Sequence, residues 1–560
     1  MHKRKITNQL TCFLPISILL CTLHPVLEAG LVKKESLVKV QEIKKSQIKK
    51  HLQYLASSQL KGRNTGSSGA ALAAKYIAAN FKKNGLAPIP GSSGYFQRFG
   101  ITRSRSNSNS KLRYNSENGS SYTFRKKDFL AAPWGGESIH LEGESVFLGY
   151  GISAPKLGYD AYQNVNIKNK IVIILGGAPK LNKNISFREV GKFDYGDFIN
   201  KSILASKRGA IAIVLILRPH ERLSSYQTKN LTQGRAYLST SLLQVNVPVF
   251  LITFNAAKSF FAEILVNDEQ NNPLLSIIEN INSGFHPYNF ELDGKFIIRA
   301  QYQRLRIHAN NVLGLVHGSD AILKNTFVII GGHFDHIGVG TNNEIFFGAD
   351  DNASGIAALL ELTRAIQINS PKPRRSIIFA AWSGEEIGLL GSQYYIENPV
   401  VPLNDTIAVL QMDMIGRNAH HASDNENQLA PQKESDNHNS LNIMGTILTP
   451  KFKSIIKENN VNIHLDLRFI SELSSINLFR RSDQWSFLKK SIPVLFFFTG
   501  FHPDYHKTSD TPDKINFEKM EKISKLIYLT IWNIADKKSQ LIINNDILSK
   551  ITFEETPTHK

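Results

Sequence analysis

The sequence predicts an α/β protein in which helices flank a mixed central sheet and a second, smaller α/β domain is inserted. From Asn310 onward, apolar strand-like runs alternate with helical runs, which is the pattern of an α/β sheet. Before that point the β-type runs are shorter and alternate with loops. At 560 residues the chain is also too long for one compact core. The expected units are residues 1–29 (signal peptide), 30–137 (first part of the main domain), 138–290 (inserted domain), 291–540 (main part) and 541–560 (polar tail).

The first 29 residues have the pattern of an export signal. A basic start at residues 2–5 precedes an apolar run from Leu10 to Leu27, and Ala29-Gly30 supplies small residues for cleavage. Two prolines interrupt the run and polar sequence follows it, which argues against a permanent membrane span. We therefore expect an exported protein, periplasmic, in the cell envelope or secreted, without a stable transmembrane span after cleavage.

Cysteine content and charge restrict the chemistry of the mature chain. Cys12 and Cys21 are the two cysteines and both lie in the signal segment, so disulfides and thiolate metal ligands are excluded downstream. Any metal must then be held by His, Asp and Glu. The formal charge is +19, but the lysines are scattered and form no basic stripe interleaved with aromatic residues. We interpret this charge as a solvated basic surface and expect no nucleic-acid partner.

The elements follow in order along the chain. Apolar residues at helical spacing predict helices over residues 36–58 and 69–84, and a Ser/Asn-rich stretch at residues 103–121 predicts an exposed loop. After residue 310, strands are expected at Phe327–Ile330, Ser376–Trp382, Ile407–Met412 and Ile492–Phe498, with a helix at Ile356–Ile366. Residues 418–442 predict a long surface loop.

Each of the four late strands leads to side chains that can bind a metal. In open α/β sheets, ligands bind beyond the carboxyl ends of the strands. We therefore expect five candidate ligands to meet at one edge: His333, Asp350, Glu386, Asp413 and His506. Five ligands are too many for one open tetrahedral zinc, but they suit two zinc ions if one carboxylate bridges them. The Asp350 carboxylate, in the small-residue run GADDNASG, is the predicted bridge.

Two further carboxylates have predicted roles in catalysis. Glu385 and Glu386 are adjacent at a strand exit, so they repel each other unless a cation lies near; we expect Glu386 on the metal and Glu385 as general base. Asp335 follows His333 by two residues, so its carboxylate can accept a hydrogen bond from the other ring nitrogen of His333. Without the other ligands, a Glu pair that opens a helix would more often simply complement the helix dipole.

Together these blocks resemble a known family. HFDHIG, GADDNASG, SGEEIGLLGS, MDMIGR and DYHKTSDTPDKI are similar to the co-catalytic di-zinc exopeptidases of metallopeptidase family twenty-eight, which includes bacterial secreted leucyl-type aminopeptidases and glutamate carboxypeptidases. LASSQLKGRNTGSSG resembles the amino-terminal segment of that family. GESVFLGYGISAPKLGYDAY and KNKIVIILGGAP resemble its inserted protease-associated domain.

The resemblance implies a ligand arrangement and a reaction. His333 and Asp413 would bind one zinc, Glu386 and His506 the other, and Asp350 would bridge, with a cis peptide between Asp350 and Asp351. Glu385 would be the general base for a metal-activated water and Asp335 the orienting residue. The pattern gives His336, His502 and Asp504 no ligand role. Gln484 stands where relatives often have histidine, which puts a contact at that position in doubt.

The expected function is an exported aminopeptidase that uses two Zn²⁺ ions and releases the first residue from peptides or proteins with free N-termini. A carboxypeptidase of the same family needs cationic groups for a substrate carboxylate, which Arg480 and Arg481 offer. A glutaminyl cyclase of the same fold, with one zinc, and a catalytically silent scaffold are further alternatives. The complete ligand set argues against both. The oligomeric state does not follow from the sequence.

Overall fold

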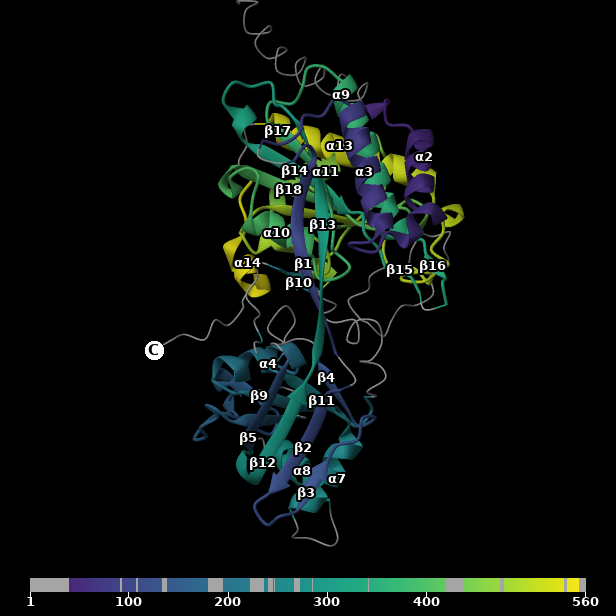
Figure 1. Cartoon of the computed structure of the whole chain (residues 1–560). Helices are drawn as coiled ribbons and strands as arrows, with labels where there is room; N and C mark the ends of the chain where they lie inside the picture. The colour runs from purple at the N-terminus through teal and green to yellow at the C-terminus, as the bar shows by residue number, and fades with distance from the viewer. Residues whose placement is uncertain are drawn as a thin grey trace, which may run out of the picture.

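The main domain is built on a nine-stranded sheet with the strand order β10-β1-β13-β17-β14-β18-β21-β19-β20 (Figure 1). The computed structural model describes residues 40–90, 93–106, 109–132, 138–179, 195–221, 236–239, 245, 247–265, 272–284, 286–340, 342–418, 437–473, 478–537 and 541–552. The strands of this sheet are β1 (Phe96–Ser106), β10 (Ala236–Leu238), β13 (Tyr302–Val316), β14 (Phe327–His333), β17 (Ser376–Trp382), β18 (Thr406–Met412), β19 (Ser440–Met444), β20 (Asp466–Phe469) and β21 (Val494–Phe498).

The centre of this sheet is parallel and has an antiparallel pairing on each side. β14 pairs in parallel with both β17 and β18, and β18 pairs in parallel with β21. β13 and β19 run antiparallel to their neighbours β17 and β21. This confirms the predicted mixed α/β sheet and the four predicted strands. The four parallel strands therefore end at the same edge.

Helices cover both faces because neighbouring residues of a strand point to opposite sides. In β14, Val328 and Ile330 contribute to one core and Ile329 to the other. The first core packs under α2 (Lys45–Leu55), α3 (Ser68–Lys83), α9 (Gly355–Ile368), α11 (Pro450–Asn460) and α13 (Phe517–Asp536). The opposite core packs under α10 (Leu390–Glu397), α12 (Gln484–Leu488) and α14 (Asn545–Thr552).

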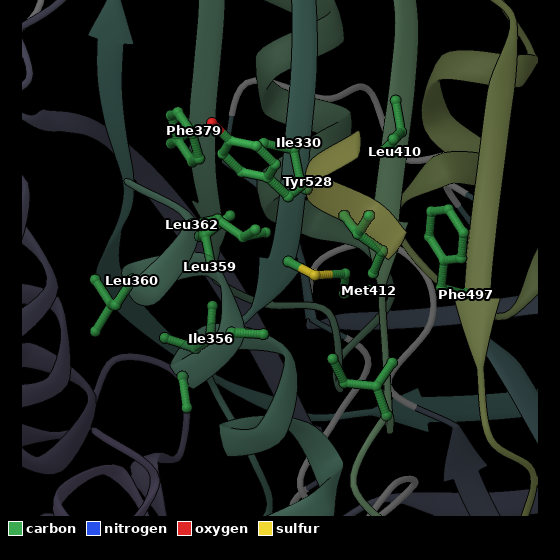
Figure 2. Close-up of a cluster of buried hydrophobic side chains, with 14 of the residues drawn as sticks. Ile330, Ile356, Leu359, Leu360, Leu362, Phe379, Leu410, Met412, Phe497 and Tyr528 are labelled. Atoms are coloured by element: carbon green, nitrogen blue, oxygen red, sulfur yellow. The ribbon is translucent and has the colours of Figure 1, made fainter. Parts of the chain in front are cut away.

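Figure 2 shows the first core between α9 and the strands. Ile356, Leu359 and Leu362 of α9 lie near Ile330 and Met412 of the sheet. The central strands are buried on both faces, so they are continuous apolar runs rather than alternating ones. This packing fixes where β14, β17 and β18 end.

The two predicted amino-terminal helices are confirmed as α2 and α3. Ser67 caps α3 by accepting a hydrogen bond from the N–H of Ala70. The predicted signal, residues 1–29, lies outside the described residues. Within the described residues, the helices are either too short or too polar to cross a membrane.

The second domain has its own eight-stranded sheet, with the strand order β3-β2-β12-β5-β8-β9-β11-β4. Its strands are β2 (Lys111–Ser116), β3 (Ser121–Thr123), β4 (Phe129–Ala132), β5 (Ile139–Phe147), β8 (Ile171–Leu175), β9 (Ala212–Ile216), β11 (Val249–Ile252) and β12 (Phe290–Ala300). Three helices accompany it: α4 (Phe198–Lys207), α7 (Phe254–Ile264) and α8 (Pro273–Gly284). β1 and β13 lead from the main sheet toward this domain (Figure 1).

The structure corrects four predictions about where elements begin and end. The second sheet spans Lys111 to Ala300, so the predicted limits of 138 and 290 are too narrow. The Ser/Asn-rich stretch predicted as a loop contains the last four residues of β1 and all of β2, because strand pairing satisfies its backbone where side chains give little apolar signal. The predicted tail at 541–560 contains α14, whose Ile551 is buried in the core. Of the predicted loop at 418–442, the last three residues belong to β19 and residues 419–436 lie outside the described part.

Candidate metal centre

One group of nitrogen and oxygen atoms meets where β14 and β18 end. His333 is the last residue of β14, and Asp413 follows the last residue of β18. His333 Nε2 lies 3.2 Å from Asp413 Oδ1 and 3.3 Å from Asp351 Oδ1. All three residues are buried. This is a set of imidazole and carboxylate ligands of the kind that zinc prefers.

A second group lies beside the first. His506 Nε2 is 3.1 Å from Asp351 Oδ2 and 3.3 Å from Glu386 Oε2. His336 Nδ1 is 2.7 Å from Glu386 Oε1 and 3.6 Å from Asp351 Oδ2. The candidate ligand atoms of His333, Asp351 and Asp413 lie within 4.8 Å of one another, and so do those of His336, Asp351 and Glu386.

Asp351 is shared by the two groups, and this corrects the predicted bridge. One of its carboxylate oxygens faces His333 and the other faces His506 and His336. Asp350 turns away: its Oδ1 accepts a hydrogen bond of 2.6 Å from the N–H of Gly416, and its Oδ2 lies 3.4 Å from His502 Nε2. Asp350 therefore holds the loop after β18, whereas Asp351 has the position predicted for Asp350.

The cis peptide is also one residue later than predicted, between Asp351 and Asn352 rather than between Asp350 and Asp351. Asn352 fixes this part of the loop through three hydrogen bonds. Its side-chain amide donates one of 2.9 Å to the Met412 carbonyl, and its side-chain oxygen accepts one each from the N–H groups of Met414 and Gly355. With two adjacent aspartates, local sequence spacing cannot tell which carboxylate faces the site. The contacts of Asn352 and Asp350 with residues 412–416 decide it.

Asp335 contacts the predicted base rather than the predicted histidine nitrogen. His333 Nδ1 lies 3.2 Å from the Asp335 backbone carbonyl but 4.0 Å from its carboxylate. The carboxylate accepts a hydrogen bond of 2.6 Å from Thr65 Oγ1 and one of 3.2 Å from the N–H of Glu385. The predicted hydrogen bond between the Asp335 carboxylate and the His333 ring is therefore wrong. Asp335 orients His333 through its backbone and fixes Glu385 through its side chain.

Sequence reasoning missed three residues that build this centre: His336, Asp351 and Asp510. His336 was expected to be local structure only, yet its ring contacts Glu386. Its place three residues after His333 was the available signal. His502 contacts Asp350, and Asp504 pairs with Arg417 and Lys514, so these two residues lie outside both groups, as expected.

Asp510 holds the loop that carries Asp351. Its carboxylate accepts hydrogen bonds from the N–H of Asp350, at 3.0 and 3.1 Å to its two oxygens, and from the N–H of Asp351 at 3.2 Å. Burial raises the pKa of Asp510 to about 6, and the nearby Asp350 acts in the same direction. This contact turns the Asp351 backbone toward the strand ends.

Arg63 ties three segments together behind the centre. Its guanidinium is buried and donates to the carbonyls of Leu55, Phe334, Phe347 and Gly348. Burial lowers the pKa of Arg63 to about 10, so it remains charged at neutral pH. One side chain thereby fixes the stretch after α2 against the loops that carry His336 and Asp351.

The buried carboxylates and histidines shift one another's protonation. Burial raises the pKa of Glu385 well above its ordinary value, whereas burial is outweighed at Asp351 by His333 and His506, which lower the pKa of that carboxyl. Burial would lower the pKa of His506, but hydrogen bonds to Asp351 and Glu386 raise it to about 10. The raised pKa of Glu385 favours uptake of a proton, which suits a general base.

A pocket opens onto the centre. Its polar wall contains His333, Asp351, Glu385, Asp413 and His506. Tyr505, whose ring stacks on His506 at 3.8 Å between centroids, also lines it. Its other lining residues are Met414, Leu478, Arg481, Phe496, Phe498 and Phe501. Gln484 is buried and donates to the carbonyl of Phe479.

Comparison with known proteins gives one family match and several partial relatives. The family model described as "Peptidase family M28" matches residues 311–531 of this chain. Aminopeptidase NAALADL1 of Rattus norvegicus is 34% identical over 140 residues, which cover 24% of this chain and 17% of that protein. Glutamate carboxypeptidase 2 homolog of Caenorhabditis elegans is 36% identical over 113 residues, covering 19% and 13%. The chain thus matches less than a fifth of the length of these two relatives.

A solved structure shares the fold over most of the chain. The aminopeptidase from Aneurinibacillus sp. strain AM-1 superposes with a TM-score of 0.55 at 21% identity, covering 90% of this chain and 97% of that one. The likeness confirms the α/β architecture of both domains together.

We predict that Arg63→Lys lowers the stability of the folded protein by about 3 kcal/mol, because an ammonium group cannot reach four carbonyls that the planar guanidinium reaches. Denaturant unfolding measures this. Arg98→Lys, at an exposed position of β1, is the matched control and should leave the midpoint within error. An unchanged midpoint for Arg63→Lys would show that these loops do not depend on the guanidinium.

Proposed function

Because residues 311–531 form a peptidase family M28 domain, we propose that this protein is a zinc-dependent aminopeptidase that hydrolyses the N-terminal peptide bond of peptides or proteins. The observation that carries the proposal is the Asp351 carboxylate, which offers one oxygen to each of two ligand groups. A shared carboxylate between two His/carboxylate groups is the arrangement that a pair of metal ions requires.

The residues of the two groups fit two zinc ions. His333 and Asp413 would hold one ion, Glu386 and His506 the other, and Asp351 both. His336, which is grouped with Asp351 and Glu386, is a further candidate ligand for the second ion. The donors are imidazole nitrogens and carboxylate oxygens, and thiolates are absent from the sequence after Cys21. When bound, the ions supply Lewis-acid polarisation of the peptide carbonyl and lower the pKa of water.

Glu385 is placed to move the proton. Its Oε2 lies 3.9 Å from His333 Nε2, and its side chain lines the pocket. The hydrogen bond from its N–H to Asp335 fixes the start of the turn that carries it. With its raised pKa, Glu385 accepts a proton from the attacking water and then donates it to the leaving amine. Asp335 acts through Glu385 and His333 and is a positioning residue.

Tyr505 supports the same reaction. Burial raises the pKa of its hydroxyl, so the phenol stays protonated at neutral pH. A protonated phenol beside the centre can donate a hydrogen bond to the oxygen of the peptide carbonyl as negative charge develops on it.

Arg481 favours a second candidate, a carboxypeptidase. It is the member of the Arg480–Arg481 pair that lines the pocket, where a guanidinium could bind a substrate's terminal carboxylate. A glutaminyl cyclase with one zinc has less support, since the second ligand group would have no use. We further propose that the protein is exported, on the signal pattern of residues 1–29.

The proposal is tested by incubating the purified protein with peptides that differ only in a free or acetylated amino terminus. We expect zinc-dependent release of the first residue from the free peptides, abolished by a chelator and restored by zinc. Cleavage that is indifferent to acetylation would favour the carboxypeptidase, and loss of the C-terminal residue would identify it. Zinc binding without any cleavage would contradict the proposal.

We predict that Glu385→Gln lowers kcat by about 10²–10⁴-fold, because the amide keeps the shape of the side chain but cannot accept the proton. Zinc content, measured by atomic emission after dialysis, should stay near the native value. Full activity in this variant would exclude Glu385 as the base.

We predict that Asp351→Asn loses zinc whereas Asp350→Asn retains more of it, since the first change weakens both ligand groups and the second weakens a hydrogen bond to Gly416. Zinc content and denaturation midpoint are measured for both variants. In the Asp350→Asn variant, the denaturation midpoint should fall more than its small loss of zinc would explain. The reverse order of zinc loss would restore Asp350 as the bridging ligand.

A further inference from the structure

Two adjacent arginines face different surroundings. Arg480 donates through Nη2 to the carbonyl of Ile551 in α14, and its guanidinium carbon lies 5.0 Å from the ring centre of Trp485. Arg481 lies 5.2 Å from the ring centre of Phe501 and lines the pocket of the metal centre. Arg480 is the last residue of the 3₁₀ turn Leu478–Arg480, and Arg481 follows that turn. Arg480 therefore serves the carboxy-terminal helix, and Arg481 has a different role.

The pocket that Arg481 lines is apolar away from the metal centre. Met414, Leu478, Phe496, Phe498 and Phe501 provide this part of its wall. Arg481 is the only lysine or arginine among the described residues that line it. A substrate group that fills this pocket therefore meets apolar side chains along its length and one permanent positive charge.

The guanidinium of Arg481 is available to a ligand. The residue is exposed, and within the described part of the chain no carboxylate lies within ion-pair distance of it. The acids on the polar wall already face a histidine: Asp351 and Asp413 contact His333, and Glu385 Oε2 lies 3.9 Å from His333 Nε2. The cation–π contact with Phe501 holds the guanidinium group, whose N–H groups can bind a carboxylate through two parallel hydrogen bonds.

We propose that Arg481 is a specificity residue that binds a carboxylate of the substrate while the apolar part of the same substrate packs against the aromatic wall. This inference rests on the proposed function and adds the substrate class. The carboxylate comes from one of two sources: the side chain of an acidic residue at the substrate's amino terminus, or the substrate's carboxy terminus. In either case a substrate with a cationic side chain in this pocket is disfavoured.

The test measures zinc-dependent hydrolysis of two pairs of substrates. The two members of each pair differ only in whether they have a carboxylate. Glutamyl and glutaminyl anilides differ in the side chain and have no terminal carboxylate. Leu-Ala and Leu-Ala amide differ at the carboxy terminus. For each pair, the ratio of kcat/KM values is measured in the native protein, Arg481→Ala, Arg481→Lys and Arg480→Ala.

We expect one of the two ratios to favour the carboxylate in the native protein and to fall about tenfold or more in Arg481→Ala. Arg481→Lys should retain part of the preference, since the charge remains but the paired donors do not. Arg480→Ala should leave the ratio unchanged. The pair that responds identifies the source of the carboxylate.

Ratios that are the same in the native protein and in Arg481→Ala, with hydrolysis intact, would overturn this inference and leave the proposed function standing. A preference that Arg480→Ala removes equally would also overturn it. A native protein that binds zinc but hydrolyses none of the four substrates would overturn the proposed function and this inference together.

Discussion

The structure depends on the burial of several carboxylates in one small region at the ends of the parallel strands. Each buried carboxylate loses hydration, and neighbouring ones repel each other, so the group is stable only where cations or hydrogen-bond donors balance it. The buried or nearly buried acids of this region are Asp335, Asp350, Asp351, Glu385, Glu386, Asp413 and Asp510. Three histidines, His333, His336 and His506, balance part of this charge, and two zinc ions would complete the balance.

This constraint explains the surroundings of the centre. Asp351 can face both ligand groups only if its loop is fixed. Asp510 fixes this loop through backbone N–H groups, and Arg63 holds the carbonyls of Phe347 and Gly348 just before it. Asp350, adjacent to Asp351, faces the opposite way and accepts from Gly416. The supporting residues are themselves charged and buried, so the site is held by a second layer of ionic contacts rather than by apolar packing alone.

Much of this arrangement could be predicted from the sequence. The predictions that were wrong have identifiable physical reasons. The apolar runs predicted where β17, β18 and β21 end, whereas β14 continues past the predicted Ile330 to His333. The structure brings His333, Glu386, Asp413 and His506 together beyond these strand ends. The prediction that Asp350 is the bridging carboxylate was wrong, because contacts with residues about 60 and 160 positions away decide which of the two aspartates faces the site. His336 was missed because its role depends on where Glu386 lies. The predicted start of the second domain was too late because β2 and β3 are short and polar.

The central claim, that Asp351 joins two zinc sites, is tested most directly by crystals of the zinc-loaded protein measured at the zinc absorption edge. The account predicts two anomalous peaks about 3.5–4 Å apart, with the Asp351 carboxylate between them. It also predicts His333 and Asp413 on one peak and Glu386 and His506 on the other. A single peak, or two peaks bridged by Asp350, would contradict the account.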